Sequence, residues 1–289
     1  NINNYWSTII IKAKASIKLY ISIKIENSLN KKVKYLWLKV LWENYGHFGL
    51  KERVNYFLIN KDADHLKERT LNKISIDKNY EAIAIKTNLL GAFDDPIKTI
   101  HKYCKNIIKK GDILVIGETP LAIMQGRYLN PKDLEYNLYT KFLCYFFHPT
   151  SSLATACGMQ LLINKIGVTR ITISLFIGLI FKIIGIKGIF YRLAGTQSSL
   201  IDDISGTTIP YDKSIVLGPK NPESICREIS FLLKIDSAVV DANDLGGVKI
   251  LSCTNKSIKK VLYHALRINP SGNDDQKTPI LLIRRINNL

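Results

Sequence analysis

The sequence predicts a mixed α/β (α+β) fold with mixed sheets for most of the chain. Short apolar runs typical of buried strands alternate with segments whose apolar residues recur at helical spacing. The chain has 289 residues, of which 46% are hydrophobic, so it can bury a sizeable core. This length corresponds to one large domain or two small ones.

The first 80 residues predict a basic accessory region that precedes the main domain. They alternate apolar runs with lysines, as in IIIKAKASIKLYISIKI, and this period of two favours strands with one solvated face. They hold 15 Lys/Arg against 7 Asp/Glu, so they are more basic than the rest of the chain. We therefore place a domain boundary near residue 80, with an N-terminal accessory region over 1–80 and an α/β domain over 81–289.

From Glu81 onward, strand and helix signals alternate. NPESICREISFLLKI, for example, has Pro222 in its first turn and an apolar face at helical spacing, so it predicts a helix. Gly111 is a suitable stop for the helix predicted over 96–110. The predicted helices are 96–110, 151–166, 221–235 and 256–268, and the predicted strands are 81–87, 111–116, 236–241 and 280–286.

Residues 171–190, ITISLFIGLIFKIIGIKGIF, form a long apolar run. The run is long enough to be a membrane-span candidate. Lys182 and Lys187 interrupt it, and a central lysine costs about 2.5–3.5 kcal/mol on insertion scales. Gly185 and Gly188 suit a turn after a buried helix. The sequence therefore favours a buried core helix, with membrane association as the less favoured alternative.

The composition excludes some classes of function and leaves others open. A formal net charge of +17 is compatible with nucleic acid, an acidic membrane surface or an anionic substrate. No arginine-rich stripe or nucleic-acid-binding motif is present, so we expect no nucleic-acid partner. The five cysteines form no C-x-x-C pair, and the five histidines lack zinc-ligand spacing. The odd number and wide spacing of the cysteines indicate reduced thiols. Reduced thiols indicate the cytoplasm, or an organelle stroma if the N-terminus is the remnant of a transit segment.

Two acidic turns, about forty residues apart, are the main candidates for chemistry. In AVVDANDLGG an apolar run ends on Asp241, and in IDDISG a turn contains Asp202. Carboxylates at the end of a buried strand suit a hard cation, and two such turns brought together can hold magnesium or manganese against phosphate. Asp and Asn at strand ends are also ordinary turn formers, which accounts for either turn alone.

Taken together, these segments resemble the coenzyme F-420 γ-glutamyl ligase family over about residues 81–286. The resemblance rests on the order of EAIAIKTNLLGAFDDP, KKGDILVIGETPLAIMQGR, IDDISG, VLGPKNPESICREI, AVVDANDLGG and NPSGNDDQKTP. It implies a GTP-dependent ligase in which a substrate carboxylate is phosphorylated and the amine of L-glutamate displaces phosphate. The family's chemistry uses two divalent ions, magnesium or manganese, and the resemblance also implies a homodimer.

The resemblance assigns roles to individual residues. It implies metal-binding carboxylates at Asp202, Asp241, Asp274 and Asp275. It implies nucleotide-binding residues at Thr87, Asn88, Leu89, Leu90, Ser205, Gly272, Asn273 and Gln276. Arg127 is a possible phosphate-binding residue, and a structural salt bridge is an equally good reading of it.

The sequence departs from the family pattern at several of these segments. The lysine that contacts the purine falls at Ile123, and the glutamate two residues later becomes Gln125. An asparagine after the first aspartate becomes Ser205, the threonine after the second becomes Ala242, and Lys277 intrudes into the last loop. These changes keep open an alternative: a catalytically inactive ligase-like protein that binds an acidic metabolite, a nucleotide or a partner.

Overall fold

The computed structural model describes residues 35–46, 49–60, 71–149, 151–201, 210–272 and 277–286. The chain divides into two compact units, Asn1–Val33 and Lys34–Leu289. The elements described below all belong to the second unit.

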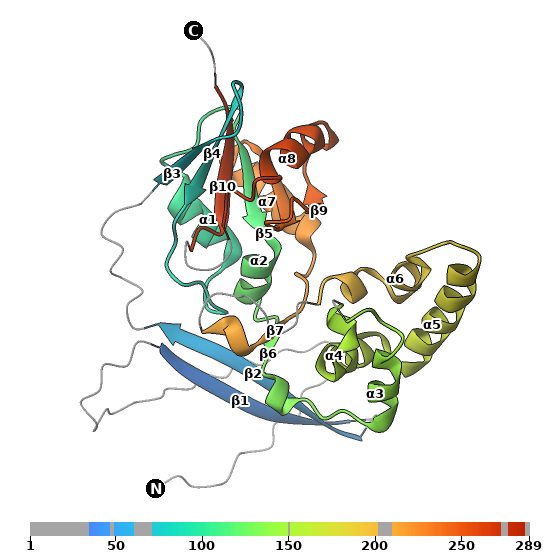
Figure 1. Cartoon of the computed structure of the whole chain (residues 1–289). Coiled ribbons are helices and arrows are strands. Elements are labelled where there is room, and N and C mark those ends of the chain that lie inside the picture. The colour runs from blue at the N-terminus through green and yellow to red at the C-terminus, as the bar shows by residue number, and fades with distance from the viewer. Residues whose placement is uncertain are drawn as a thin grey trace, which may run out of the picture. The chain divides into compact units, whose positions relative to one another are not determined.

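This unit contains a mixed six-stranded sheet, in the order β3-β4-β10-β5-β8-β9 (Figure 1). Strands β5 and β8 are parallel, and every other pair of neighbours is antiparallel. The strands are β3 (Leu71–Ser75), β4 (Tyr80–Ile85), β5 (Ile113–Gly117), β8 (Asp236–Ala242), β9 (Val248–Cys253) and β10 (Ile280–Arg285).

Both faces of this sheet are covered, which explains the continuous apolar runs of its central strands. Successive side chains of a strand point to opposite faces. Leu114 and Ile116 therefore pack with the helices α1 (Pro96–Cys104) and α7 (Pro222–Leu233). Ile113 and Val115 pack on the other face with α8 (Lys259–Leu266). The result is a three-layer arrangement of helices, sheet and helix.

Two smaller β elements lie beside the sheet. The antiparallel hairpin of β1 (Tyr35–Gly46) and β2 (Gly49–Asn60) is one of them. The pair β6 (Tyr128–Leu129) and β7 (Ile215–Val216) is the other. Leu58 of β2 is buried in one cluster with Tyr128 and Tyr211, and Trp37 of β1 meets the Tyr211 ring edge-on at 5.5 Å. The hairpin therefore packs against the short helix η4 (Tyr211–Lys213).

The remaining α-helices are α2 (Glu118–Met124), directly after β5, and a helical part that we define as residues 138–194. The helical part contains α3 (Leu138–Cys144), α4 (Ala156–Ile166), α5 (Val168–Ile183) and α6 (Ile189–Ala194). It has its own core, in which Leu143, Met159, Ile171 and Phe190 are buried together. Short 3₁₀ turns occur at Pro131–Asp133, Ser152–Ala154, Thr196–Ser199 and Lys256–Ile258.

The predicted mixed α/β fold class is confirmed, and helices and strands occur in the predicted segments. Some elements are shorter than predicted. The helix expected over 96–110 begins correctly, with Asp95 as its N-cap, and ends at Cys104. The next residues form a turn in which the Asp112 carboxylate accepts a hydrogen bond from the backbone N–H of Lys109 at 2.8 Å. The helical spacing of Ile107 and Ile108 therefore comes from a turn that packs against the core.

The turn predicted at Gly185 and Gly188 is confirmed, whereas the burial predicted for the helix within 171–190 is wrong for most of its residues. The segment forms α5 and α6, with a break between Ile183 and Ile189, and only Ile171, Ser174 and Leu175 of α5 are buried. Within the described residues, no individual helix has the length and apolar character needed to cross a membrane. The pair α4–α5 meets that test only when taken together, and it bends by 112°.

The strands predicted in the first 80 residues are present where the structure describes them, as β1, β2 and β3. The domain boundary near residue 80 stays a prediction. Strand β3 precedes it in the chain and pairs with β4, so the six-stranded sheet takes its outer strand from before residue 80.

Candidate functional site

The carboxyl ends of β4, β5 and β8 meet at one edge of the sheet, and a cavity of about 490 Å³ opens there. Ile280, the first residue of β10, pairs with both Ile85 and Ile116, so the ends of these strands are level. The cavity is lined by Thr87, Asn88, Leu89, Leu90, Val115, Gly117, Glu118, Thr119, Pro120, Ile123, Tyr211, Val240, Asp241, Ala242, Asn243, Leu266, Ser271, Gly272, Lys277, Thr278, Pro279 and Leu281. The edge at strand carboxyl ends is where α/β sheets commonly bind ligands.

The loop after β4 contributes the four residues Thr87–Leu90, all predicted as nucleotide-binding. The backbone N–H of Thr87 donates to the carbonyl oxygen of Lys277 at 2.9 Å. The backbone N–H of Asn88 donates to the hydroxyl of Tyr103 at 3.1 Å. These contacts fasten the loop to the segment before β10 and to α1, so the cavity wall is preformed.

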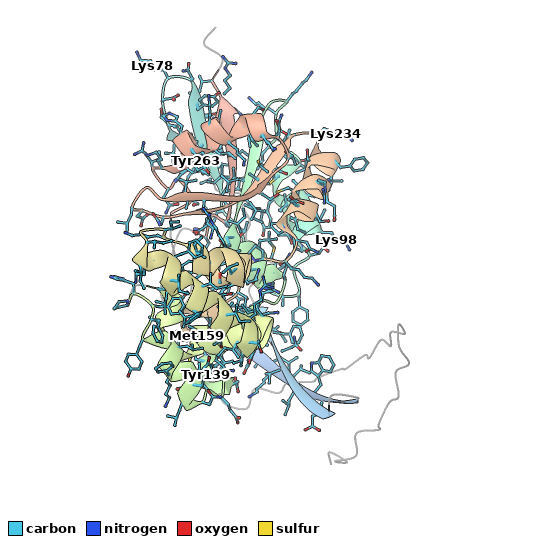
Figure 2. All side chains as sticks on the ribbon, turned by 90° about the vertical axis from the view of Figure 1, so that its right-hand side faces the viewer. Lys78, Lys98, Tyr139, Met159, Lys234 and Tyr263 are labelled. Atoms are coloured by element: carbon cyan, nitrogen blue, oxygen red, sulfur yellow. The ribbon has the colours of Figure 1, made fainter. Side chains whose placement is uncertain are left out.

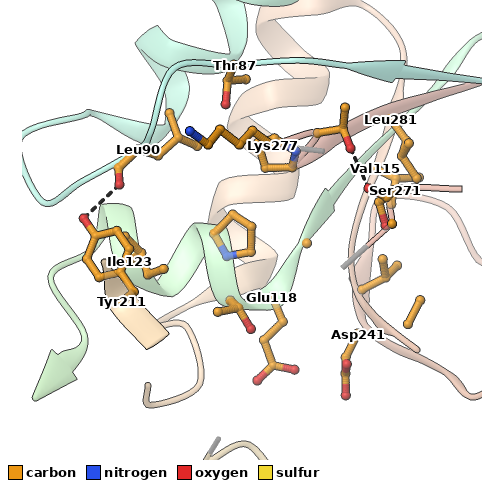
Figure 3. Close-up of a pocket in the computed structure, with 18 of the residues that line it drawn as sticks. Thr87, Leu90, Val115, Glu118, Ile123, Tyr211, Asp241, Ser271, Lys277 and Leu281 are labelled. Carbon is orange, nitrogen blue, oxygen red and sulfur yellow. Dashed lines mark hydrogen bonds between the residues drawn. The ribbon is translucent and has the colours of Figure 1, made fainter. Parts of the chain in front are cut away.

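The far end of that loop is fixed by a buried tyrosine. The Tyr211 hydroxyl donates to the carbonyl oxygen of Leu90 at 2.8 Å, as Figure 3 shows. Burial raises the pKa of Tyr211, so the hydroxyl keeps its proton for this bond. Tyr128 packs edge-on against Tyr211, and burial raises the pKa of Tyr128 to about 12. The aromatic contacts tie the β1–β2 hairpin to the cavity wall through Trp37.

Glu118 is a cavity residue that sequence reasoning missed. It is the first residue of α2, directly after β5, and it is buried. Gly117 pairs with Val240 in the parallel β5–β8 register, which puts Glu118 level with Asp241 on the next strand. Figure 3 shows both carboxylate side chains pointing the same way from these strand ends. The strand-ending motif Val-Ile-Gly-Glu was the available signal, but the strand pairing that makes it meaningful is not visible in the sequence.

Asp241 is the last residue but one of β8, and it lines the cavity with an exposed side chain. Its neighbour across the sheet is Lys249 of β9. The Lys249 ammonium donates to the carbonyl oxygen of Ser199 at 3.0 Å and to its hydroxyl at 3.1 Å. The chain just before Asp202 is thus held beside the strand that pairs with Asp241. Asp202 itself, like Ser205, lies outside the described residues.

The loop before β10 supplies a further part of the cavity lining. The backbone N–H of Gly272 donates to the carbonyl oxygen of Asn269 at 2.9 Å, and the Thr278 hydroxyl donates to the carbonyl oxygen of Ser271. Lys277 has a φ of 52°, in the left-handed region that non-glycine residues seldom adopt. Its side chain extends toward Leu90 in Figure 3. Four predicted residues of this loop lie outside the described residues: Asn273, Asp274, Asp275 and Gln276.

Arg127 is not among the residues that line this cavity. Its guanidinium donates to the carbonyl oxygen of Gly218 and, at 2.9 Å, to the side-chain oxygen of Gln197. Burial lowers the pKa of Arg127. These contacts hold the segment that leads to Asp202, which is a structural use of the side chain. The phosphate-binding role of Arg127 stays a prediction.

Three of the departures from the family pattern lie at the cavity: Ile123, Ala242 and Lys277. Ile123 and Ala242 both line it, so the positions of the purine-contacting lysine and of the threonine present apolar side chains. Gln125 instead pairs with the backbone of Lys220, donating at 2.9 Å and accepting at 2.6 Å.

The donor set at this edge fits a hard cation. Glu118 and Asp241 supply carboxylate oxygens, the ligand type that magnesium and manganese prefer. Within the described ranges, no group of three or more His, Cys, Asp or Glu side chains is placed to hold a metal ion. A complete site at this position thus needs oxygen ligands beyond these two carboxylates, from residues outside those ranges, from substrate phosphates or from water.

A comparison of the N-terminal part of the chain with known proteins also supports the family. No curated protein matches the sequence. Residues 1–63 match the family model of the N-terminal Ig-like domain of F420-0:gamma-glutamyl ligase. The matched residues lie within the first 80 residues, for which the motifs indicated no family. They precede residues 81–286, which carry the motif resemblance. The N-terminal part of this chain is therefore similar to the Ig-like domain of F420-0:gamma-glutamyl ligase, which suggests a ligase-like function.

Proposed function

We propose that this chain is a nucleotide- and divalent-metal-dependent ligase that forms an amide of the γ-glutamyl type. The substrates are a carboxylate and an amino acid, L-glutamate, and GTP supplies the phosphoryl group. The observation that carries the proposal is the cavity itself. It brings together Thr87–Leu90, Asp241 and Gly272, which come from three distant segments that the motif resemblance assigns to one site.

The proposed reaction has two steps. An oxygen of the substrate carboxylate attacks the γ-phosphorus of GTP, the bond to the bridging oxygen breaks, and GDP leaves. The amine of glutamate then attacks the acyl carbon, phosphate leaves with the electron pair of the C–O bond, and the amine loses a proton. Both steps build negative charge on a departing phosphate oxygen, of GDP in the first and of inorganic phosphate in the second, so positioning and charge neutralisation supply most of the catalysis.

The residues of the cavity are suited to this work. Glu118 and Asp241 would hold magnesium or manganese, which neutralises phosphate charge when bound. The Lys277 side chain places a positive charge among the lining residues, where an anionic substrate group can pair with it. A volume of about 490 Å³ falls within the range of about 300–1,000 Å³ typical of small-molecule sites.

The test is calorimetric titration of the full chain with GTP in the presence and absence of magnesium or manganese. The proposal expects metal-dependent binding of GTP, and it expects GDP formation only when a carboxylate substrate is supplied. Absence of any triphosphate binding contradicts it. A panel of acidic acceptors with glutamate, followed by mass spectrometry, then identifies the amide.

A second candidate is a ligase-like protein that binds its ligand without catalysis. The specific observation in its favour is Ile123, which lines the cavity where the family has a purine-contacting lysine. This candidate expects nucleotide or metabolite binding with no GDP and no amide formed in the same experiment.

A further inference from the structure

We propose that the hairpin of α5 and α6 is a membrane-docking element that enters the interface of an anionic lipid bilayer. The inference rests on the helical part of the chain alone and does not depend on the proposed ligase activity.

The first observation is an exposed apolar stripe on α5. Ile173, Phe176, Ile180 and Ile183 are all exposed, Phe176 by 67% and Ile183 by 86%. Their spacings of three and four residues put them on one side of the helix, because an α-helix turns once every 3.6 residues. The opposite side carries Ile171, Ser174 and Leu175, which are buried in the core of the helical part.

The tip between α5 and α6 continues this surface. It reads Lys-Ile-Ile-Gly-Ile-Lys from Lys182 to Lys187, and its isoleucines Ile183, Ile184 and Ile186 are exposed by 86%, 64% and 44%. Three exposed isoleucines thus stand between two exposed lysines. Isoleucine suits the acyl boundary of a bilayer, and lysine suits its phosphates.

The tip is held rigidly by the helices behind it. A Cβ atom at Gly178 would lie 3.0 Å from the Cβ atom of Phe190, so α6 packs closely against α5 at this glycine. Arg170 also ties the start of α5 to the end of α6, because its guanidinium donates two hydrogen bonds to the carbonyl oxygen of Leu193 at 3.0 and 2.9 Å. The isoleucines are therefore presented by a fixed hairpin.

The charge of this part of the sequence identifies the partner. From Tyr136 to Ile201 the chain contains no Asp or Glu, and it contains six basic residues: Lys141, Lys165, Arg170, Lys182, Lys187 and Arg192. Within residues 136–201 the charged side chains that accompany this apolar surface are all basic, which is complementary to anionic lipid headgroups. Figure 2 turns this helical part toward the viewer.

The same charge argues against a second copy of the chain. A two-fold symmetric dimer places the same surface on both partners. Lys182 and Lys187 of one copy would then meet lysines of the other, with no carboxylate in this part of either chain to compensate them. Anionic lipid removes that repulsion, whereas self-association increases it.

The geometry favours docking over crossing. Helix α5 has 16 residues, which at about 1.5 Å per residue span roughly 24 Å, less than the hydrocarbon thickness of about 30 Å. One of its sides is also committed to the protein core. The hairpin therefore lies in the interface, with its tip and its exposed stripe toward the lipid.

The test is vesicle flotation of the full chain at low salt. One set of vesicles is phosphatidylcholine alone, and the other is an equal mixture of phosphatidylcholine and phosphatidylglycerol. The proposal expects flotation with the mixed vesicles, and it expects salt near 1 M to weaken it, since the screening length there is about 3 Å. Absence of flotation with the mixed vesicles overturns the proposal without recourse to any variant.

Variants then locate the surface. Changing Ile183, Ile184 and Ile186 together to serine is expected to reduce flotation to background, and Lys182→Gln with Lys187→Gln to weaken it on the order of tenfold. The matched control changes three exposed apolar residues elsewhere, Phe231, Leu232 and Ile268, to serine. Circular dichroism checks the fold of each variant.

Two variant outcomes contradict the proposal. In the first, the isoleucine variant floats as well as the unchanged chain. In the second, light scattering shows that the isoleucine variant loses a dimer while neither chain binds vesicles, which assigns the surface to a second copy.

Discussion

The backbone N–H of Thr87 donates a 2.9 Å hydrogen bond to the carbonyl oxygen of Lys277, although the two residues are far apart in the sequence. The bond joins the loop after β4 to the segment before β10. Both segments carry predicted nucleotide-binding residues, and the strand pairing of β4 with β10 brings them to the same edge. The cavity wall is thus a consequence of sheet topology.

A substitution of Lys277 can remove a positive charge from the cavity with little effect on stability. With a φ of 52°, its backbone adopts a conformation that glycine adopts more easily. We expect Lys277→Gly to change the free energy of unfolding by no more than about 1 kcal/mol, because relief of strain offsets the added freedom of the unfolded chain. The same change removes the positive charge, so GTP affinity should fall about tenfold in calorimetry. Unchanged affinity in a folded variant contradicts the assigned role.

Tyr211 links the aromatic cluster to the cavity through the carbonyl oxygen of Leu90. Tyr211→Phe leaves that buried acceptor without its donor, which should cost about 1–3 kcal/mol of stability. Urea unfolding measures the loss. Tyr263→Phe, at an exposed tyrosine of α8, is the matched control and should be within about 0.5 kcal/mol of the unchanged chain. Equal effects of the two changes would refute the structural role of this bond.

A nearly buried ion pair lies at the end of the sheet opposite the cavity. Arg284 donates to both carboxylate oxygens of Asp112, at 2.9 and 2.7 Å, and the hydrogen bonds to Asp112 raise the pKa of Arg284. Arg284→Met leaves the buried Asp112 carboxylate unpaired, so it should cost about 3–5 kcal/mol. The adjacent exposed Arg285→Met is the control. Thermal unfolding distinguishes them, and a loss below about 1 kcal/mol for Arg284→Met speaks against the pair.

Asp94 gives the stability a dependence on pH. Burial raises the pKa of its carboxyl group, which accepts a hydrogen bond from the backbone N–H of Gly91 at 2.7 Å. Because the folded chain holds this proton more firmly than the unfolded chain, the contribution of Asp94 to stability is present below its unfolded pKa and is lost as the pH rises through its folded pKa. Asp94→Asn should remove that slope. Parallel stability curves for both proteins above the unfolded pKa of about 3.9 would contradict this assignment.

The elements that could be predicted from the sequence are those whose pattern of residues fits only one type of secondary structure. In α7 the proline at the start and the apolar face of Ile225 and Ile229 indicate a helix, and β8 is an apolar run that ends on a carboxylate. The exposure of α5 was missed because an apolar residue has the same pattern whether it faces the core or another partner. Phe176 and Ile183 show this, since composition alone assigned them to the interior.

The candidate site was predictable only in part. Thr87–Leu90, Asp241 and Gly272 were predicted from the family resemblance, and the structure brings them to one cavity, while their roles stay predictions. Glu118 was missed because a single glutamate after a strand carries no signal of its own. It gains meaning only from the parallel pairing of β5 with β8, which depends on residues more than a hundred positions apart. Lys277 was recognised as a departure from the family pattern. It lies in the cavity because it directly precedes β10, whose first residue is at the cavity edge of the sheet.

The proposed function requires one cavity to hold a divalent cation and a nucleoside triphosphate, with Glu118 and Asp241 as carboxylate ligands. The most direct measurement is calorimetric titration with GTP, with and without magnesium, of the full chain and of Glu118→Gln and Asp241→Asn. Glu135→Gln, at an exposed glutamate outside the cavity, is the matched control. We expect magnesium to strengthen GTP binding in the unchanged chain and in the control. We expect this gain to fall at least about tenfold in both cavity variants, while their unfolding temperatures stay close to that of the unchanged chain. GTP binding that is independent of magnesium, or a magnesium effect that survives both changes in folded protein, would contradict it.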